Sequence, residues 1–116
     1  SRTIILPVDV DTAYILSGTG YSSVSSQSRD ALIQFSFLDN QGNLITDEYD
    51  YASFSRSLGT HYFYIPTSPE GAPIKREFFA PANANAIVLG FRAWADTDEP
   101  GISSRWKFER AEEVSN

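Results

Sequence analysis

The alternation of apolar and polar residues at every second position is the feature that most constrains the fold of this chain. Ile33, Phe35 and Phe37 alternate with Gln34 and Ser36, and the same period recurs over 61–65 and 87–94. A period of two places successive side chains on opposite faces of a strand, whereas a helix repeats every 3.6 residues. The residues are largely β-branched or aromatic, which suits a half-buried sheet. We therefore predict three strands that each turn one face toward a core.

Weaker alternation predicts five further strands, over Thr3–Leu6, Ala13–Ser17, Tyr51–Ser57, Ile74–Phe79 and Arg105–Arg110. Turn sequences rich in Gly, Asp, Asn and Pro separate the strands, at 39–42, 58–59, 69–71 and 98–101. Residues 18–30 form a Ser-rich polar loop, and no helix is evident. Short strands at regular spacing predict an all-β fold, an antiparallel β-sandwich of the jelly-roll kind with about eight strands.

The length of 116 residues fits one β-sandwich domain over 1–116. The chain starts with Ser1 and Arg2, and it shows no apolar signal segment. We therefore expect a domain excised from a larger protein, and we draw no conclusion on secretion from the missing leader.

Charge and composition narrow the classes of partner. The formal net charge is −6, which disfavours nucleic acid and anionic membranes as partners. No apolar run approaches the roughly 20 residues of a membrane span. The chain has no Cys and one His, so thiol chemistry and a His-based zinc site are not expected.

The order of the sequence features resembles a known group of domains. The resemblance is based on the segments Asp11–Ser17 (DTAYILS), Ile33–Asn43 (IQFSFLDNQGN), Phe79–Ala84 (FAPANA) leading into Ile87–Trp94 (IVLGFRAW), and Trp106–Phe108 (WKF). This order resembles the jelly-roll accessory domains of the galactose-binding-like and carbohydrate-binding-module type, over nearly the whole chain. The resemblance implies an accessory domain of a secreted protein, extracellular or at the cell surface. Domains of this type bind glycans, carry a structural calcium, or only pack on a neighbouring domain.

Catalysis is not expected. A nucleophilic serine needs a histidine and an acid beside it. The chain has one histidine, His61, which lies at the start of the predicted strand over 61–65. We interpret His61 as a surface or strand-end residue. Glycoside hydrolysis needs two carboxyl groups across a cleft, whereas the acids here cluster in loops and tails, so a hydrolase is kept only as a minor alternative.

A structural calcium is an alternative that the sequence leaves open. The turn Asp39–Asn43 offers side-chain oxygens, but it lacks the alternating acids of a calcium loop and is better explained as a hairpin turn with Gly42 at positive φ. Asp9, Asp11, Asp96 and Asp98 could also converge on a cation. No metal ligand set is assigned.

The odd or even position of a residue along its strand, here called its parity, decides which face of the sheet it lies on. Parity therefore defines a candidate binding face. Phe35, Phe37, Phe63 and Phe91, together with Phe54 and Phe108, are expected in the core. The opposite parity then carries a set of aromatic and polar residues: Tyr62, Tyr64, Arg92, Trp94, Gln34 and Ser36. If their strands adjoin in one sheet, the aromatic rings can cover the apolar face of a sugar while Arg, Gln and Ser bind its hydroxyls. Trp94 could instead lie under the polar loop over 18–30.

Two functions remain as hypotheses. The first is a non-catalytic carbohydrate-binding module that holds a glycan on this aromatic and polar face. The alternative is a structural or interaction domain that packs on a neighbouring domain or subunit, because Tyr, Trp and Arg are also the preferred anchors of protein interfaces.

Overall fold

The computed structural model describes residues 2–21, 31–46, 49, 52–93 and 106–111. These residues form two antiparallel sheets and no helix, so the all-β prediction is confirmed. The strands are β1 (Arg2–Pro7), β2 (Ala13–Gly20), β3 (Ala31–Leu38), β4 (Leu44–Ile45), β5 (Ser53–Ser55), β6 (Thr60–Ile65), β7 (Ala72–Phe79), β8 (Ala86–Ala93) and β9 (Lys107–Arg110). Within the described ranges, the chain offers no helix with the length and apolar character to cross a membrane.

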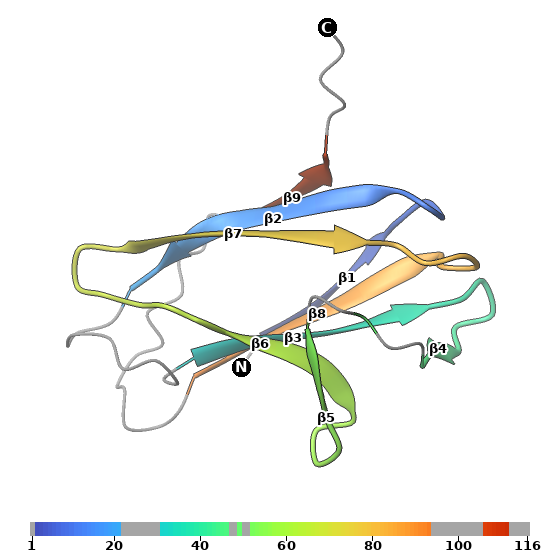
Figure 1. The fold of residues 1–116 in the computed structure, drawn as a ribbon, viewed down its shortest axis with the longest axis horizontal. Helices are drawn as coiled ribbons and strands as arrows, with labels where there is room; N and C mark the ends of the chain where they lie inside the picture. Colours follow the sequence, from blue (N-terminus) through green and yellow to red (C-terminus); the bar gives the residue numbers. More distant parts are fainter. Residues whose placement is uncertain (1, 22–30, 47–48, 50–51, 94–105, 112–116) are drawn as a thin grey trace, which may run out of the picture.

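The two sheets lie face to face as a sandwich (Figure 1). The larger sheet has the order β1-β8-β3-β6-β5, with β4 paired to β3, and the smaller sheet has the order β7-β2-β9. The pairs β1–β8, β2–β7 and β3–β6 are nested from the ends of the chain toward its middle, which is the jelly-roll arrangement. The sequence did not predict β4, because two residues are too few to show a period.

The core fills the space between the sheets with aromatic and branched side chains. Phe35, Phe37 and Phe78 are fully buried, and the rings of Phe35 and Phe78 meet edge to face across the two sheets with centroids 4.9 Å apart. Burying each such side chain contributes about 1.5–3 kcal/mol relative to leaving it in water. The burial of Phe63 and Phe91 confirms the predicted core positions on β6 and β8.

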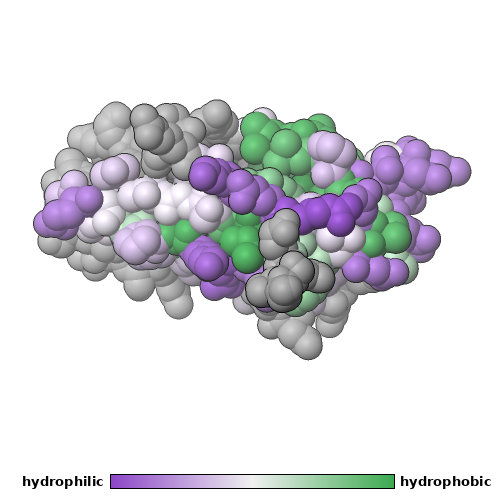
Figure 2. All heavy atoms as spheres, turned by 90° about the horizontal axis from the view of Figure 1, so that it is seen from above, coloured by the Kyte–Doolittle hydropathy of each residue, from purple (hydrophilic) through white to green (hydrophobic). Residues whose placement is uncertain are grey.

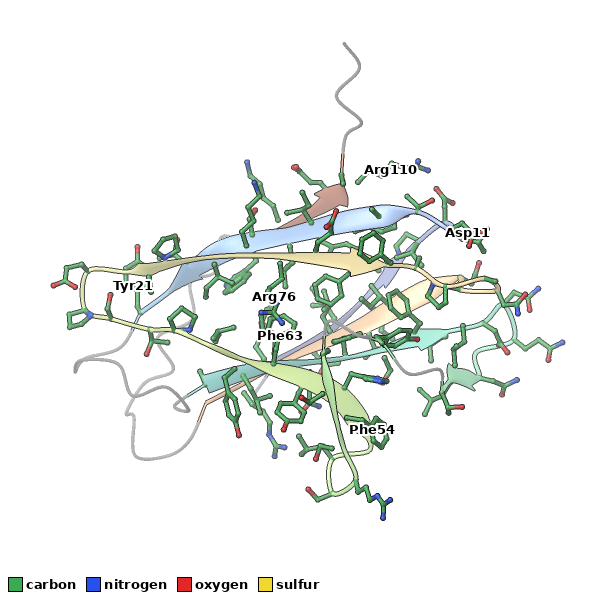
Figure 3. The ribbon with its side chains drawn as sticks, viewed as in Figure 1. Asp11, Tyr21, Phe54, Phe63, Arg76 and Arg110 are labelled. Atoms are coloured by element: carbon green, nitrogen blue, oxygen red, sulfur yellow. The ribbon has the colours of Figure 1, made fainter. Side chains whose placement is uncertain are left out.

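Two predictions about burial were wrong. His61 is not a surface residue: it is 4% exposed and lies against the rings of Phe35 and Tyr49, at centroid distances of 5.5 and 4.6 Å. Its parity is that of Phe63, so the alternation along β6 already placed it on the core face. Phe54 is 53% exposed, because β5 is a short edge strand at the margin of the larger sheet (Figure 3). Phe108 is partly buried against the core.

Arg76 is a charged side chain that lies between the sheets. It projects from β7 toward the larger sheet, with its guanidinium carbon 4.1 Å from the centroid of the Phe63 ring (Figure 3). Edge strand β7 thus places a cation over an aromatic face, an interaction that stabilises by about 0.5–2 kcal/mol.

The predicted turns are confirmed where the structure describes them. Asp39 Oδ1 accepts hydrogen bonds from the backbone N–H groups of Gln41 and Asn43, and Gly42 has a φ of 82°. Turns also lie at 58–59 and 69–71. The predicted turn at 98–101 lies outside the described residues, as do residues 22–30 of the predicted loop, whereas Gly18–Gly20 belong to β2.

Candidate functional site

The outer face of the larger sheet, which points away from the smaller sheet, brings the predicted binding residues together. Strands β6, β3 and β8 are adjacent, as the prediction required. Gln34 is directly opposite Tyr62, and Leu32 is paired with Tyr64 on one side and with Arg92 on the other. One face of three neighbouring strands therefore carries both tyrosines, the glutamine and the arginine.

The predicted residues differ in how much surface they offer. Tyr64 is 37% exposed and Tyr62 is half-buried, and their rings meet edge to face with centroids 5.6 Å apart. Arg92 is exposed, whereas Ser36 retains only 8% of its surface. Trp94 lies outside the described residues.

A hollow of about 310 Å³ opens on this outer face. Its lining comes from three strands and one turn, namely Thr3, Gln34, Ser57, Leu58, Gly90, Phe91 and Arg92. The turn between β5 and β6 projects from the side of the larger sheet that faces away from the smaller sheet (Figure 1). Ser57 and Leu58 of this turn form one wall, so the face is concave rather than flat.

Beside Gln34 lies a smaller pit of about 30 Å³, which has room for one water-sized group. Thr3, Gln34, Ser36, Thr60 and Gly90 are among its lining residues. Gln34 Oε1 and Thr60 Oγ1 are buried there without a hydrogen-bond partner in the described part of the protein. A buried polar atom without a partner costs about 1–3 kcal/mol, so these two atoms suit a bound hydroxyl or water.

Gly90 forms part of the floor of the hollow. It pairs with Thr3 on β1 and with Gln34 on β3, and a Cβ at this position would lie 3.0 Å from Gln34 Cγ. A larger residue at 90 would therefore narrow the hollow and displace the glutamine.

Sequence reasoning missed Thr3, Gly90 and the two turn residues Ser57 and Leu58. A glycine inside an otherwise regular strand signals a site where another group approaches closely, so Gly90 could have been found. Nothing in the sequence indicates that the turn after β5 folds beside β8, because that proximity depends on strand order.

Within the residues that the structure describes, no group of three or more His, Cys, Asp or Glu side chains could hold a metal ion. Asp9 forms an ion pair with Arg110, while Asp96 and Asp98 lie outside the described ranges. The backbone N–H groups of Asn43 and Gln41 hold the pKa of the Asp39 carboxyl below its usual value. The hydrogen bonds of the turn therefore account for the position of the Asp39 side chain.

The outer face of the smaller sheet has a different composition. Lys75 and Lys107 flank Ser17, and Glu77 and Glu109 flank Ile15 in the next outward-facing row. Hydrophilic side chains lie among apolar ones over this face, which is seen from above in Figure 2. Bands of opposite charge on exposed strands are typical of a solvated face.

Fold and geometry thus define an all-β jelly-roll sandwich with a hollow on one sheet face. A scan against protein-family models and searches of curated proteins and of solved structures found no match.

Proposed function

We propose that this protein is a non-catalytic carbohydrate-binding module that holds a glycan in the hollow of the larger sheet. The observation that carries the proposal is the hollow of about 310 Å³ on the same sheet face as Tyr62 and Tyr64, where Tyr62 is the cross-strand neighbour of the lining residue Gln34. This volume lies at the lower end of the roughly 300–1,000 Å³ usual for small-molecule sites. The proposal includes an extracellular or cell-surface setting, where such glycans are accessible.

The side chains supply the two kinds of contact that a sugar needs. The tyrosine rings offer faces and edges that can cover the apolar C–H groups of a pyranose. Gln34, Thr3 and Ser57 line the hollow and can bind hydroxyl groups. The pit beside Gln34 has room for one hydroxyl, which would satisfy Gln34 Oε1 or Thr60 Oγ1.

The test is a glycan array followed by titration of the best ligands. We expect Tyr64→Ala to weaken binding about tenfold, because one aromatic contact contributes on the order of 1 kcal/mol. Phe79→Ala is the matched control, since Phe79 is an exposed aromatic residue of the smaller sheet, 51% accessible. An array without any bound glycan overturns the function, and equal losses in both variants overturn the placement of the site.

A second candidate function, an interaction domain, rests on apolar residues at the far end of the same outer face. Ile5 is 63% exposed beside Val88, and Leu44 is 55% exposed on β4. Sedimentation of the domain tests this function. Self-association that Ile5→Ser abolishes supports an interface there, and a monomer at all concentrations leaves the glycan proposal as the better explanation.

A further inference from the structure

The lining of the hollow is rich in hydrogen-bond donors and contains no carboxylate. Arg92 contributes a guanidinium group, Gln34 an amide, and Thr3 and Ser57 hydroxyl groups, while the remaining lining residues are Leu58, Gly90 and Phe91. The sequences of the six strands of the larger sheet contain no Asp or Glu, although the chain has 15 of them. Acidic residues are therefore concentrated outside this sheet.

Arg92 is available for a ligand. It is exposed at the hollow and makes no ion pair with the described residues. Two other strand arginines are engaged within the protein, since Arg110 pairs with Asp9 and Arg76 lies over the Phe63 ring. A guanidinium presents parallel N–H groups that match a carboxylate or a sulfate, so Arg92 is suited to binding an oxyanion.

We propose that the hollow binds an acidic glycan, whose uronate carboxylate or sulfate ester is held by Arg92. The inference rests on the proposed function and specifies its ligand class. Neutral sugars present hydroxyl groups that donate as well as accept, and this lining offers no carboxylate to accept from them. An anionic group only accepts, so it complements the guanidinium of Arg92, while the sugar hydroxyl groups can donate to Gln34 Oε1.

The test uses pairs of glycans in which one kind of acidic group is present or removed. Oligogalacturonate is compared with its methyl ester, and chondroitin sulfate with desulfated chondroitin, by titration at physiological salt. We expect at least one acidic member to bind about tenfold or more tightly than its neutral or desulfated partner, because a charge-assisted bidentate contact is lost. The first pair detects a carboxylate ligand and the second a sulfate ligand.

Arg92→Gln should abolish this preference, and Arg92→Lys should retain part of it, because a lysine keeps the charge without the planar fork. Lys107→Gln is the control, since it makes the same change in net charge on the smaller sheet. Thermal unfolding of each variant identifies any that fails to fold, and Arg92→Lys then carries the test. Equal binding within both pairs overturns the acidic ligand but leaves the glycan function. No binding in these pairs and on the full array overturns both.

Discussion

Strands β2 and β8 each carry an internal glycine, Gly18 and Gly90, but the two glycines face different environments. Gly18 faces the core, where a Cβ would lie 2.3 Å from Cδ2 of Trp106, so the indole occupies the space of the missing side chain. Gly90 faces outward, where the same atom would lie 3.0 Å from Gln34 Cγ and would project into the hollow. The same residue type therefore serves packing in one sheet and shapes a site in the other.

The difference shows that the space left by a glycine can contribute to a surface site when the glycine faces outward, whereas core side chains occupy that space when it faces inward. The Trp106 ring also packs on Phe91, with centroids 5.0 Å apart, so it links β9 to the larger sheet. At Gly90 the neighbouring side chain is that of Gln34, which lies further from the added Cβ than the indole does at Gly18. Substitutions at the two glycines should thus separate stability from binding.

The largest effect is expected for Gly18→Ala. The added methyl group overlaps the Trp106 ring, and overpacking of this kind typically costs about 1–3 kcal/mol of unfolding free energy. Urea denaturation should show a lower midpoint with an unchanged slope, while the folded protein keeps its glycan affinity. A stability within about 0.5 kcal/mol of the parent would contradict the close contact of Trp106 with Gly18.

Gly90→Ala should affect binding rather than stability. Alanine suits a strand better than glycine by about 0.5–1 kcal/mol, which offsets the shift that Gln34 must make. We expect glycan affinity to fall about tenfold in a titration, with the unfolding midpoint close to that of the parent. Ser17→Ala, on the outer face of the smaller sheet, is the control and should change neither quantity.

Gln34→Leu tests whether the polar atom beside Gly90 is retained for binding. Replacing an amide whose buried Oε1 has no described partner by an apolar side chain of similar shape should leave stability unchanged or raise it by about 1 kcal/mol. Glycan affinity should fall several-fold, as measured by titration. A marked loss of stability would show instead that the amide is structural.

The smallest effect concerns Asp39, which lies outside both glycine regions. Its pKa is lowered in the folded protein by the backbone N–H groups of Asn43 and Gln41. The stabilisation is therefore fully present above the unfolded-state pKa of about 3.9, and it is lost as the pH falls through the folded pKa. An NMR titration should place the Asp39 midpoint below that value, and Asp39→Asn should remove this part of the acid dependence without changing glycan affinity.

Much of the fold could be predicted from the sequence because side-chain alternation is a local property. The parity of Phe35 and Phe37 predicted which face of β3 is buried, and Asp39 and Gly42 predicted the turn that follows it. The prediction for His61 was wrong because a polar side chain occupies a core-facing position, on the same face of β6 as Phe63. Strand β4 is too short to show a period.

The candidate site could be predicted only in part. Parity identified Gln34, Tyr62, Tyr64 and Arg92 as members of one face, and the strand order β6-β3-β8 made them neighbours. Thr3 comes from β1 and Ser57 from the turn after β5, two segments far apart in the chain. Their proximity depends on non-local strand pairing, which the sequence pattern does not encode locally.

By itself the sequence determined an all-β chain and the buried parity of its main strands, because both follow from residue type and a period of two. Only the tertiary structure decided that β1 pairs with β8 and that the turn after β5 closes one side of the outer face. It also decided that Trp106 occupies the space beside Gly18, while Gly90 lies beside Gln34 and lines the hollow. The physical reason is that a hollow is a property of several segments packed together, whereas alternation is a property of one.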